Sequence, residues 1–195
     1  MSRISEMMLQ LYGADEAKIV AARCAELDPW FGQYVQDTVC DIIWQLPPLN
    51  LFEKSLATIV ALSTLQKEEQ LQIHIKGFYN LGGSFSDLEA VFAYLLQQGY
   101  VESTQLLLNV LDRVQHSEKS AKSQHAILDA KNKALIDLTS VITLGNNEVT
   151  KKLLEHLLQE KTLTEEEIRG VLRHATIYCG CPCAMNGFAM LKLVL

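Results

Sequence analysis

Glycine and proline are scarce in this chain, which has ten glycines and four prolines among 195 residues. Residues that favour helices, such as Leu, Ala, Gln, Glu and Lys, are plentiful. No segment shows sustained alternation of apolar and polar residues with turn chemistry, so no sheet of consequence is expected. Apolar residues make up 49% of the chain and charged residues only 21%, which is a globular composition. The sequence therefore predicts an all-α protein.

An excess of positive charge is also absent, since the formal net charge is −6. This charge offers no general attraction for nucleic acid or for anionic lipid. No stretch approaches the roughly 20 consecutive apolar residues of a membrane helix. The first residues do not combine a basic start with an apolar run, so no secretory signal is recognised. We therefore expect a soluble, cytoplasmic protein with neither nucleic-acid nor membrane partners.

A Cys-x-x-Cys pair is missing, and the five cysteines do not suggest a disulfide framework. Three of them, Cys179, Cys181 and Cys183, form the segment C-G-C-P-C. A redox pair there would be strained, and a metal site with His174 as fourth ligand would have too short a loop. Packing as small apolar side chains is the favoured interpretation, with a reaction of one thiol as the alternative. We predict no metal and no cofactor.

The chain is predicted to contain two related helical units. A first helix over residues 14–27 is followed by one that begins at Asp28-Pro29 and ends at Pro47-Pro48. Four more helical segments follow, the last over 102–113, before a polar stretch that reads as a linker. The predicted division is residues 1–113 for the N-terminal helices and first unit, 114–129 for the linker, and 130–195 for the second unit.

The second unit repeats the apolar register of the first at an offset of 79 and then 80 residues. Leu56 corresponds to Leu135, and Val91 corresponds to Val171. The change of offset predicts a one-residue insertion near Gly145-Asn146. Such repetition indicates that each unit buries its apolar face against its twin or another subunit.

The end of the second unit carries a recognisable pattern, in which a capped acidic helix bears a histidine and runs into Tyr-x-Gly-x-Pro-x-Ala-x-Asn. The positions are Thr164, Glu167, His174, Tyr178, Gly180, Pro182, Ala184 and Asn186. This pattern resembles the carboxymuconolactone decarboxylase and alkylhydroperoxidase D-like superfamily. The resemblance implies tandem helical units in an oligomeric bundle, a trimer or hexamer, with a small-molecule ligand. The apolar C-terminal segment 184–195 also favours self-association.

The thiol site of the hydroperoxidase branch is not present. That branch has a glutamate, a Cys-x-x-Cys pair and a histidine, and the matching residues here are Ser55, Lys67, Gln70 and His74. A thiol relay cannot operate there without thiols. Only the histidine of that set remains as a candidate for catalysis.

Two histidines are the candidate acid–base groups. His74 follows Glu69 on a helix, and a carboxylate that orients an imidazole makes it a general base. The alternative is a half-buried histidine on an apolar face. His174 and Tyr178 lie one turn apart and could form a proton-relay pair, although packing of Tyr178 in the core is favoured for this pair.

Three functions are therefore considered. The first is an enzyme with acid–base chemistry on a small organic molecule near His74, with Glu69 assisting. The second is a non-catalytic oligomeric relative that has lost the site. The third is thiol-dependent antioxidant activity at Cys179, Cys181 or Cys183. If the protein is an enzyme, a lyase of the decarboxylase type is preferred over a peroxidase.

Overall fold

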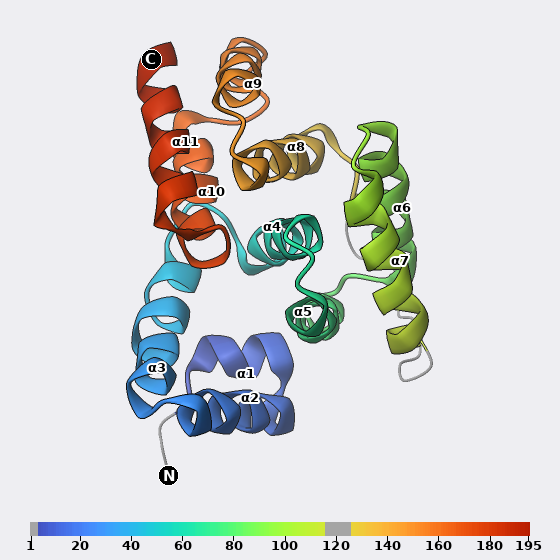
Figure 1. Ribbon diagram of the computed structural model, residues 1–195, viewed down its shortest axis with the longest axis vertical. Helices are drawn as coiled ribbons and strands as arrows, with labels where there is room; N and C mark the ends of the chain where they lie inside the picture. The colour runs from blue at the N-terminus through green and yellow to red at the C-terminus, as the bar shows by residue number, and fades with distance from the viewer. Residues whose placement is uncertain (1–3, 116–125) are drawn as a thin grey trace.

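The structure is a computed structural model, and it describes residues 4–115 and 126–195 (Figure 1). These ranges contain eleven α-helices and two short helical turns of other types, with no β-strand. The prediction of an all-α fold is confirmed. In the same part of the chain, no helix has the length and the hydropathy that crossing a bilayer requires.

The N-terminal region forms three α-helices and two irregular turns. The helices are α1 (Glu6–Tyr12), α2 (Ala14–Leu27) and α3 (Pro29–Tyr34). The Asp28 side chain caps α3 by accepting from the Phe31 N–H at 2.8 Å, and proline occupies the first turn, as predicted. A π-helical turn, η1 (Val35–Cys40), and a 3₁₀ turn, η2 (Ile43–Gln45), follow.

The prediction of one regular helix from Asp28-Pro29 to Pro47 is therefore wrong. The π turn adds a residue to the helical repeat and rotates the side chains that follow it. The apolar side chains of this segment consequently do not share one buried face. Trp30 is 69% exposed and Ile42 is 54% exposed, whereas Trp44 is 1% exposed and belongs to the core.

Eight further helices make up the rest of the described fold, and they fall into two sets of four. The first set is α4 (Leu51–Thr64), α5 (Glu68–Asn80), α6 (Phe85–Gln97) and α7 (Val101–Gln115). The second set is α8 (Ala130–Leu144), α9 (Asn147–Gln159), α10 (Glu165–Tyr178) and α11 (Gly180–Val194).

The helix starts of the second set follow those of the first at offsets of 79, 79, 80 and 79 residues. The extra residue therefore lies between α9 and α10, and its predicted position near Gly145-Asn146 is wrong. The cap residue Asn146 still follows the offset of 79 from Lys67, the residue that precedes α5. Of the predicted linker, residues 116–125 lie outside the described residues, and α8 begins at Ala130.

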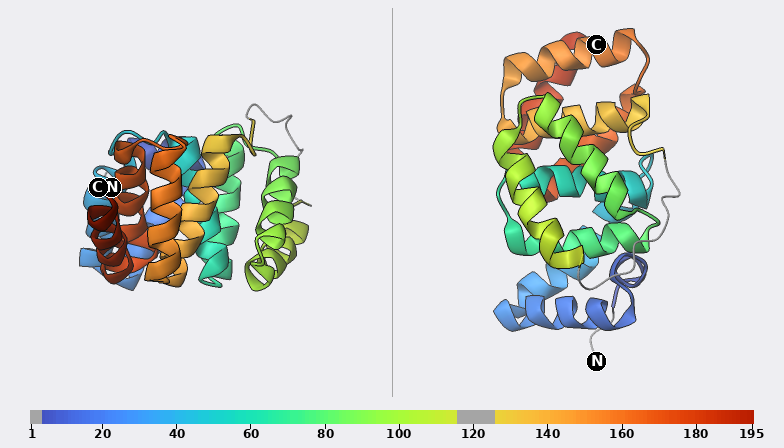
Figure 2. Two further views of the ribbon diagram at one scale, coloured as in Figure 1. Left: turned by 90° about the horizontal axis from the view of Figure 1, so that it is seen from above. Right: turned by 90° about the vertical axis from the view of Figure 1, so that its right-hand side faces the viewer.

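Helix α4 lies at the centre of the molecule and contacts α5, α7, α8 and α10 (Figure 1). One apolar core is formed mainly by side chains of α4 to α7, and a second mainly by side chains of α8 to α11. The N-terminal helices lie at one end of the molecule, far from α9 (Figure 2, right). A third core cluster joins these helices to Trp44 and to Tyr178 of α10. This third cluster surrounds the candidate site.

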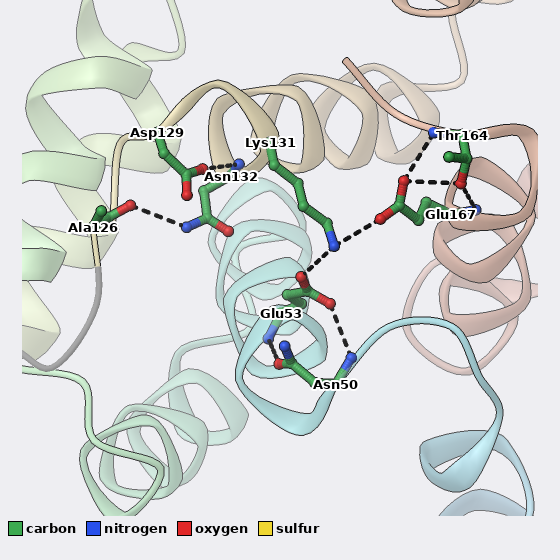
Figure 3. A network of polar contacts seen from close by, with 8 residues as sticks. All are labelled: Asn50, Glu53, Ala126, Asp129, Lys131, Asn132, Thr164 and Glu167. Atoms are coloured by element: carbon green, nitrogen blue, oxygen red, sulfur yellow. Dashed lines mark hydrogen bonds and ion pairs between the residues drawn. The ribbon is translucent and has the colours of Figure 1, made fainter. Parts of the chain in front are cut away.

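A partly buried ion-pair network ties the two sets of helices together (Figure 3). The Lys131 ammonium lies 2.6 Å from a carboxylate oxygen of Glu53 and 2.7 Å from one of Glu167. Each glutamate also closes a capping box, with Asn50 on α4 and with Thr164 on α10. Burial alone would raise the pKa of Glu167, but hydrogen bonds from Lys131 and Thr164 outweigh it and leave that pKa lowered. One cation thus fixes the starts of three helices.

Candidate functional site

A pocket of about 450 Å³ lies between the N-terminal helices and the central helices. Most of its lining comes from residues 7–44, on α1, α2, α3, η1 and η2. The opposite wall consists of Gln70, Ile73 and His74 from α5 and residues 176–178 from α10. The candidate residues His74 and Tyr178, which are far apart in the sequence, therefore share one pocket.

His74 lies on the inner face of α5, where it is 8% exposed. Its Nε2 atom is 3.3 Å from the hydroxyl oxygen of Tyr178. The hydroxyl oxygen of Tyr12 lies 3.5 Å from Nδ1 and 3.4 Å from Nε2 of the same ring. Trp44 stacks on the ring with a centroid separation of 6.1 Å. Two phenol hydroxyls and an indole thus fix the position of this imidazole.

Tyr178 connects His74 to the interior of the protein. The Trp44 Nε1–H donates to the Tyr178 oxygen at 3.1 Å. Because an indole can only donate, the phenol oxygen accepts this bond and keeps its own proton for another partner. The Thr58 hydroxyl also hydrogen-bonds to Tyr178, and the Thr58 oxygen is 2.8 Å from Nε2 of His174. A continuous chain of polar groups therefore runs from Tyr12 to His174.

His174 lies at the inner end of this chain, and it reaches Tyr178 through Thr58 and not as the direct pair considered from the sequence. The ring centroids of His174 and Tyr178 lie 5.2 Å apart with tilted planes, and the link between them passes through Thr58. The edge of Trp44 packs on His174 at 4.8 Å. Thr58 comes from α4, so a residue of the first helix set links the two α10 residues that were considered as a relay pair.

Burial keeps every group of this chain uncharged near neutral pH. It lowers the pKa of His74 to about 3. It lowers the pKa of His174 to about 3 as well, with a further contribution from the Lys54 charge. The pKa values of Tyr12 and Tyr178 are raised, mainly by the same loss of solvent. At pH 7 the site consists of neutral imidazoles and protonated phenols.

Lys54 holds the turn that presents Trp44. Its ammonium donates to the backbone carbonyls of Trp44 at 2.7 Å and of Leu46 at 2.6 Å. Burial lowers the pKa of Lys54 to about 8. A lysine 3% exposed within an apolar helix requires such partners. These two bonds fix the 3₁₀ turn η2 against α4, and so they set the position of the indole.

Glu69 does not orient His74, contrary to the sequence interpretation. Its carboxylate accepts from the Arg23 guanidinium at 3.0 Å, and both side chains are largely exposed. Five residues along an α-helix correspond to about 140° around its axis, so Glu69 and His74 face different directions. Gln70, one turn before His74, lines the pocket in its place. Glu69 therefore does not line the pocket, and it is connected to the pocket only by its ion pair with the lining residue Arg23.

The clustered cysteines lie outside the pocket, at the junction of α10 and α11. Cys179 contacts the Thr143 hydroxyl at 3.1 Å, and burial raises the pKa of its thiol. Cys179 and Cys183 pack against the second core, whereas Cys181 is exposed. All three are free thiols. Among the described residues, no group of three potential ligands is suited to a metal ion.

Several residues of the site are not predictable from local sequence patterns. Tyr12, Trp44 and Thr58 each contact a candidate residue across at least 62 positions of sequence, so no local pattern links them. Cys24 and Cys40 also line the pocket, and burial raises both thiol pKa values, that of Cys40 to about 12. The one available signal was Lys54, a charged residue within the apolar run LFEKSLATIV.

Residues 110–193 match the family described as the carboxymuconolactone decarboxylase family. The resemblance drawn from the sequence is thus confirmed for this segment, which contains His174, Tyr178 and the three clustered cysteines. No match to the chain was found among curated proteins. His74 and the N-terminal helices lie outside the matched residues.

Proposed function

We propose that this protein, whose residues 110–193 match the carboxymuconolactone decarboxylase family, performs acid–base chemistry on a small organic molecule in the pocket at His74. The observation that carries this proposal is the position of His74, whose ring lines the pocket between the Tyr12 and Tyr178 hydroxyls. A catalytic base must lie within hydrogen-bond reach of its substrate, and a pocket-lining imidazole meets this requirement.

In the proposed reaction, the neutral His74 ring takes a proton from one atom of the bound molecule and returns it to another. A base with a pKa of about 3 is weak on its own. The negative charge that forms on the substrate beside the ring opposes this weakness, since an adjacent anion favours the imidazolium. Tyr12 and Tyr178 are hydrogen-bond donors placed to stabilise an oxyanion. The relay through Thr58 to His174 supports the orientation of Tyr178.

Proton exchange at a carbon acid tests this proposal. We expect the protein to accelerate the incorporation of deuterium next to the carbonyl of 2-tetralone in D₂O. Proton NMR measures this exchange as the loss of the corresponding proton signal. His74→Phe should lower the rate at least tenfold, because it removes the base and keeps a ring of similar size. General bases typically contribute about 10²–10⁴-fold to a rate. Tyr178→Phe should have a smaller effect, since Tyr12 remains as a donor.

Exchange rates that are equal for the parent protein and for His74→Phe would contradict the assignment of His74. His156→Phe serves as the matched control, because that histidine lies on the exposed face of α9. A parent protein with no exchange above buffer would favour the alternative of a non-catalytic relative. The antioxidant alternative has less support, because burial raises the Cys179 pKa and the three clustered cysteines lie away from His74.

Two further sequence predictions are retained as parts of the proposal. The matching helix offsets support an origin of the chain from two related units. The apolar residues Met185, Leu193 and Leu195 of the C-terminal segment are 68%, 65% and 62% exposed, which supports self-association through α11. The trimer or hexamer and the cytoplasmic location stay predictions.

A further inference from the structure

We propose that the pocket at His74 selects an uncharged, largely apolar molecule that carries a carbonyl or hydroxyl oxygen, and that the N-terminal helices set this selectivity. The inference rests on the function proposed above and narrows its substrate class. It favours ketones, esters and lactones without a free carboxylate. The corresponding chemistry is proton transfer next to a carbonyl, without loss of carbon dioxide.

Four uncharged polar groups line the pocket at His74, one helical turn from it, or in contact with its ring. They are the His74 ring, the Tyr12 and Tyr178 hydroxyls and the Gln70 amide, and Tyr34, Thr176 and Arg23 also contribute polar groups to the lining. The remaining lining is mainly apolar, with side chains from α1, α2, α3 and η1 that include Met7, Met8, Val20, Leu27, Val35 and Val39. A ligand that fits this arrangement is apolar over most of its surface and offers one oxygen to the polar end.

Arg23 is the one formally charged residue among the described side chains that line the pocket. Its guanidinium is 3.0 Å from the Glu69 carboxylate, and the two side chains are 60% and 70% exposed. This charge is therefore balanced and lies at the rim. Lys54, which is close to the site, directs its ammonium to two backbone carbonyls. A carboxylate next to His74 would be buried without a cation, which is costly.

The pKa shifts of the pocket residues also favour an uncharged ligand. Burial lowers the pKa of His74 and raises the pKa of Tyr12 and of Tyr178, so the pocket disfavours charge of either sign. Cys24 on α2 and Cys40 on η1 also line the pocket, and burial raises the pKa values of their thiols as well. The surroundings that keep five side chains neutral would also disfavour a charged ligand.

The selectivity is assigned to the N-terminal helices because they form most of the pocket wall. The wall from α1, α2, α3 and η1 precedes the family segment 110–193, which contributes only residues 176–178 to the lining. The π turn η1 supplies Val35, Val39 and Cys40, and π-helical turns occur frequently at functional sites. The substrate of a family relative therefore does not determine the ligand of this pocket.

Calorimetric titration at pH 7 with 2-naphthol and 2-naphthoate tests the inference, because these probes share one ring system and differ in charge. We expect 2-naphthol to bind at least tenfold more tightly than 2-naphthoate. Val20→Trp, which places a large side chain in the pocket wall, should abolish binding. Ile19→Trp is the matched control on the same helix, since Ile19 is 59% exposed and does not line the pocket, and it should bind as the parent does.

Equal or tighter binding of 2-naphthoate would overturn the inference and leave the function proposed for His74 in place. Loss of that binding in Arg23→Gln would then identify the cation that captures the carboxylate. Binding of 2-naphthol that survives Val20→Trp, or no binding of either probe, would also overturn it. The proposed function is judged separately, by the dependence of 2-tetralone exchange on His74.

Discussion

Acidification from pH 7 to pH 5 should destabilise the protein by roughly 3–4 kcal/mol, because two buried histidines must remain neutral for the chain to stay folded. The pKa values of His74 and His174 are lowered from 6.5 to about 3 in the folded protein. Between these values the unfolded chain binds more protons than the folded chain. Their contribution to stability is therefore complete above about pH 6.5 and is lost as the pH falls toward 3.

Urea unfolding followed by circular dichroism at pH 5, 6 and 7 measures this dependence. His74→Gln and His174→Gln should each remove about half of the loss between pH 7 and pH 5, although both variants lower stability at pH 7. His156→Gln should leave the dependence unchanged, because that side chain is exposed on α9. An unaltered pH dependence in both buried-site variants would contradict the assignment of neutral, buried rings.

Replacing Trp44 by alanine should cost about 3–5 kcal/mol of folding stability, the range found for large aromatic side chains in cores. Trp44 is 1% exposed, and its ring packs against His74 and His174 at centroid distances of 6.1 and 4.8 Å. The substitution would leave a cavity at the point where α5, α10 and η2 meet. It would also remove the hydrogen bond to the Tyr178 hydroxyl.

Trp30→Ala is the matched control, since Trp30 is 69% exposed and stacks only on Tyr34 among the ring contacts described for it. We expect a cost below about 1 kcal/mol there, as for most exposed positions. Trp44→Phe keeps much of the volume but loses the N–H donor, so its cost should lie between the two. Equal unfolding midpoints for Trp44→Ala and Trp30→Ala would show that Trp44 does not organise the site.

Local chemistry in the sequence predicted much of the fold. Thr164 and Glu167 form the capping box that their spacing indicated, and Asp28-Pro29 starts a helix. Ser84 and Asp87 form a capping box of the same kind at the start of α6. These features depend on residues within one turn of one another. For this reason a single sequence is sufficient to recognise them.

The site could be predicted only in part, because most of its contacts join distant segments. The family pattern pointed to His174 and Tyr178, and alignment with the family pointed to His74. The hydrogen bond from Trp44 to Tyr178 spans 134 positions, and the contact of Tyr12 with His74 spans 62. The π turn that positions Cys40 has no pattern that we recognised in the sequence. Glu69 was misplaced because a spacing of five was treated as one helical face.

The most direct test of the account is a long-range proton–nitrogen NMR spectrum of the histidine rings at pH 5, for the parent protein and Tyr178→Phe. His74 and His174 should both give neutral imidazole signals at this pH, well below the ordinary pKa of 6.5. Loss of the Tyr178 hydroxyl should shift the Nε2 resonance of His74. Imidazolium signals from His74 at pH 5, or a His74 resonance unchanged in Tyr178→Phe, would contradict these assignments.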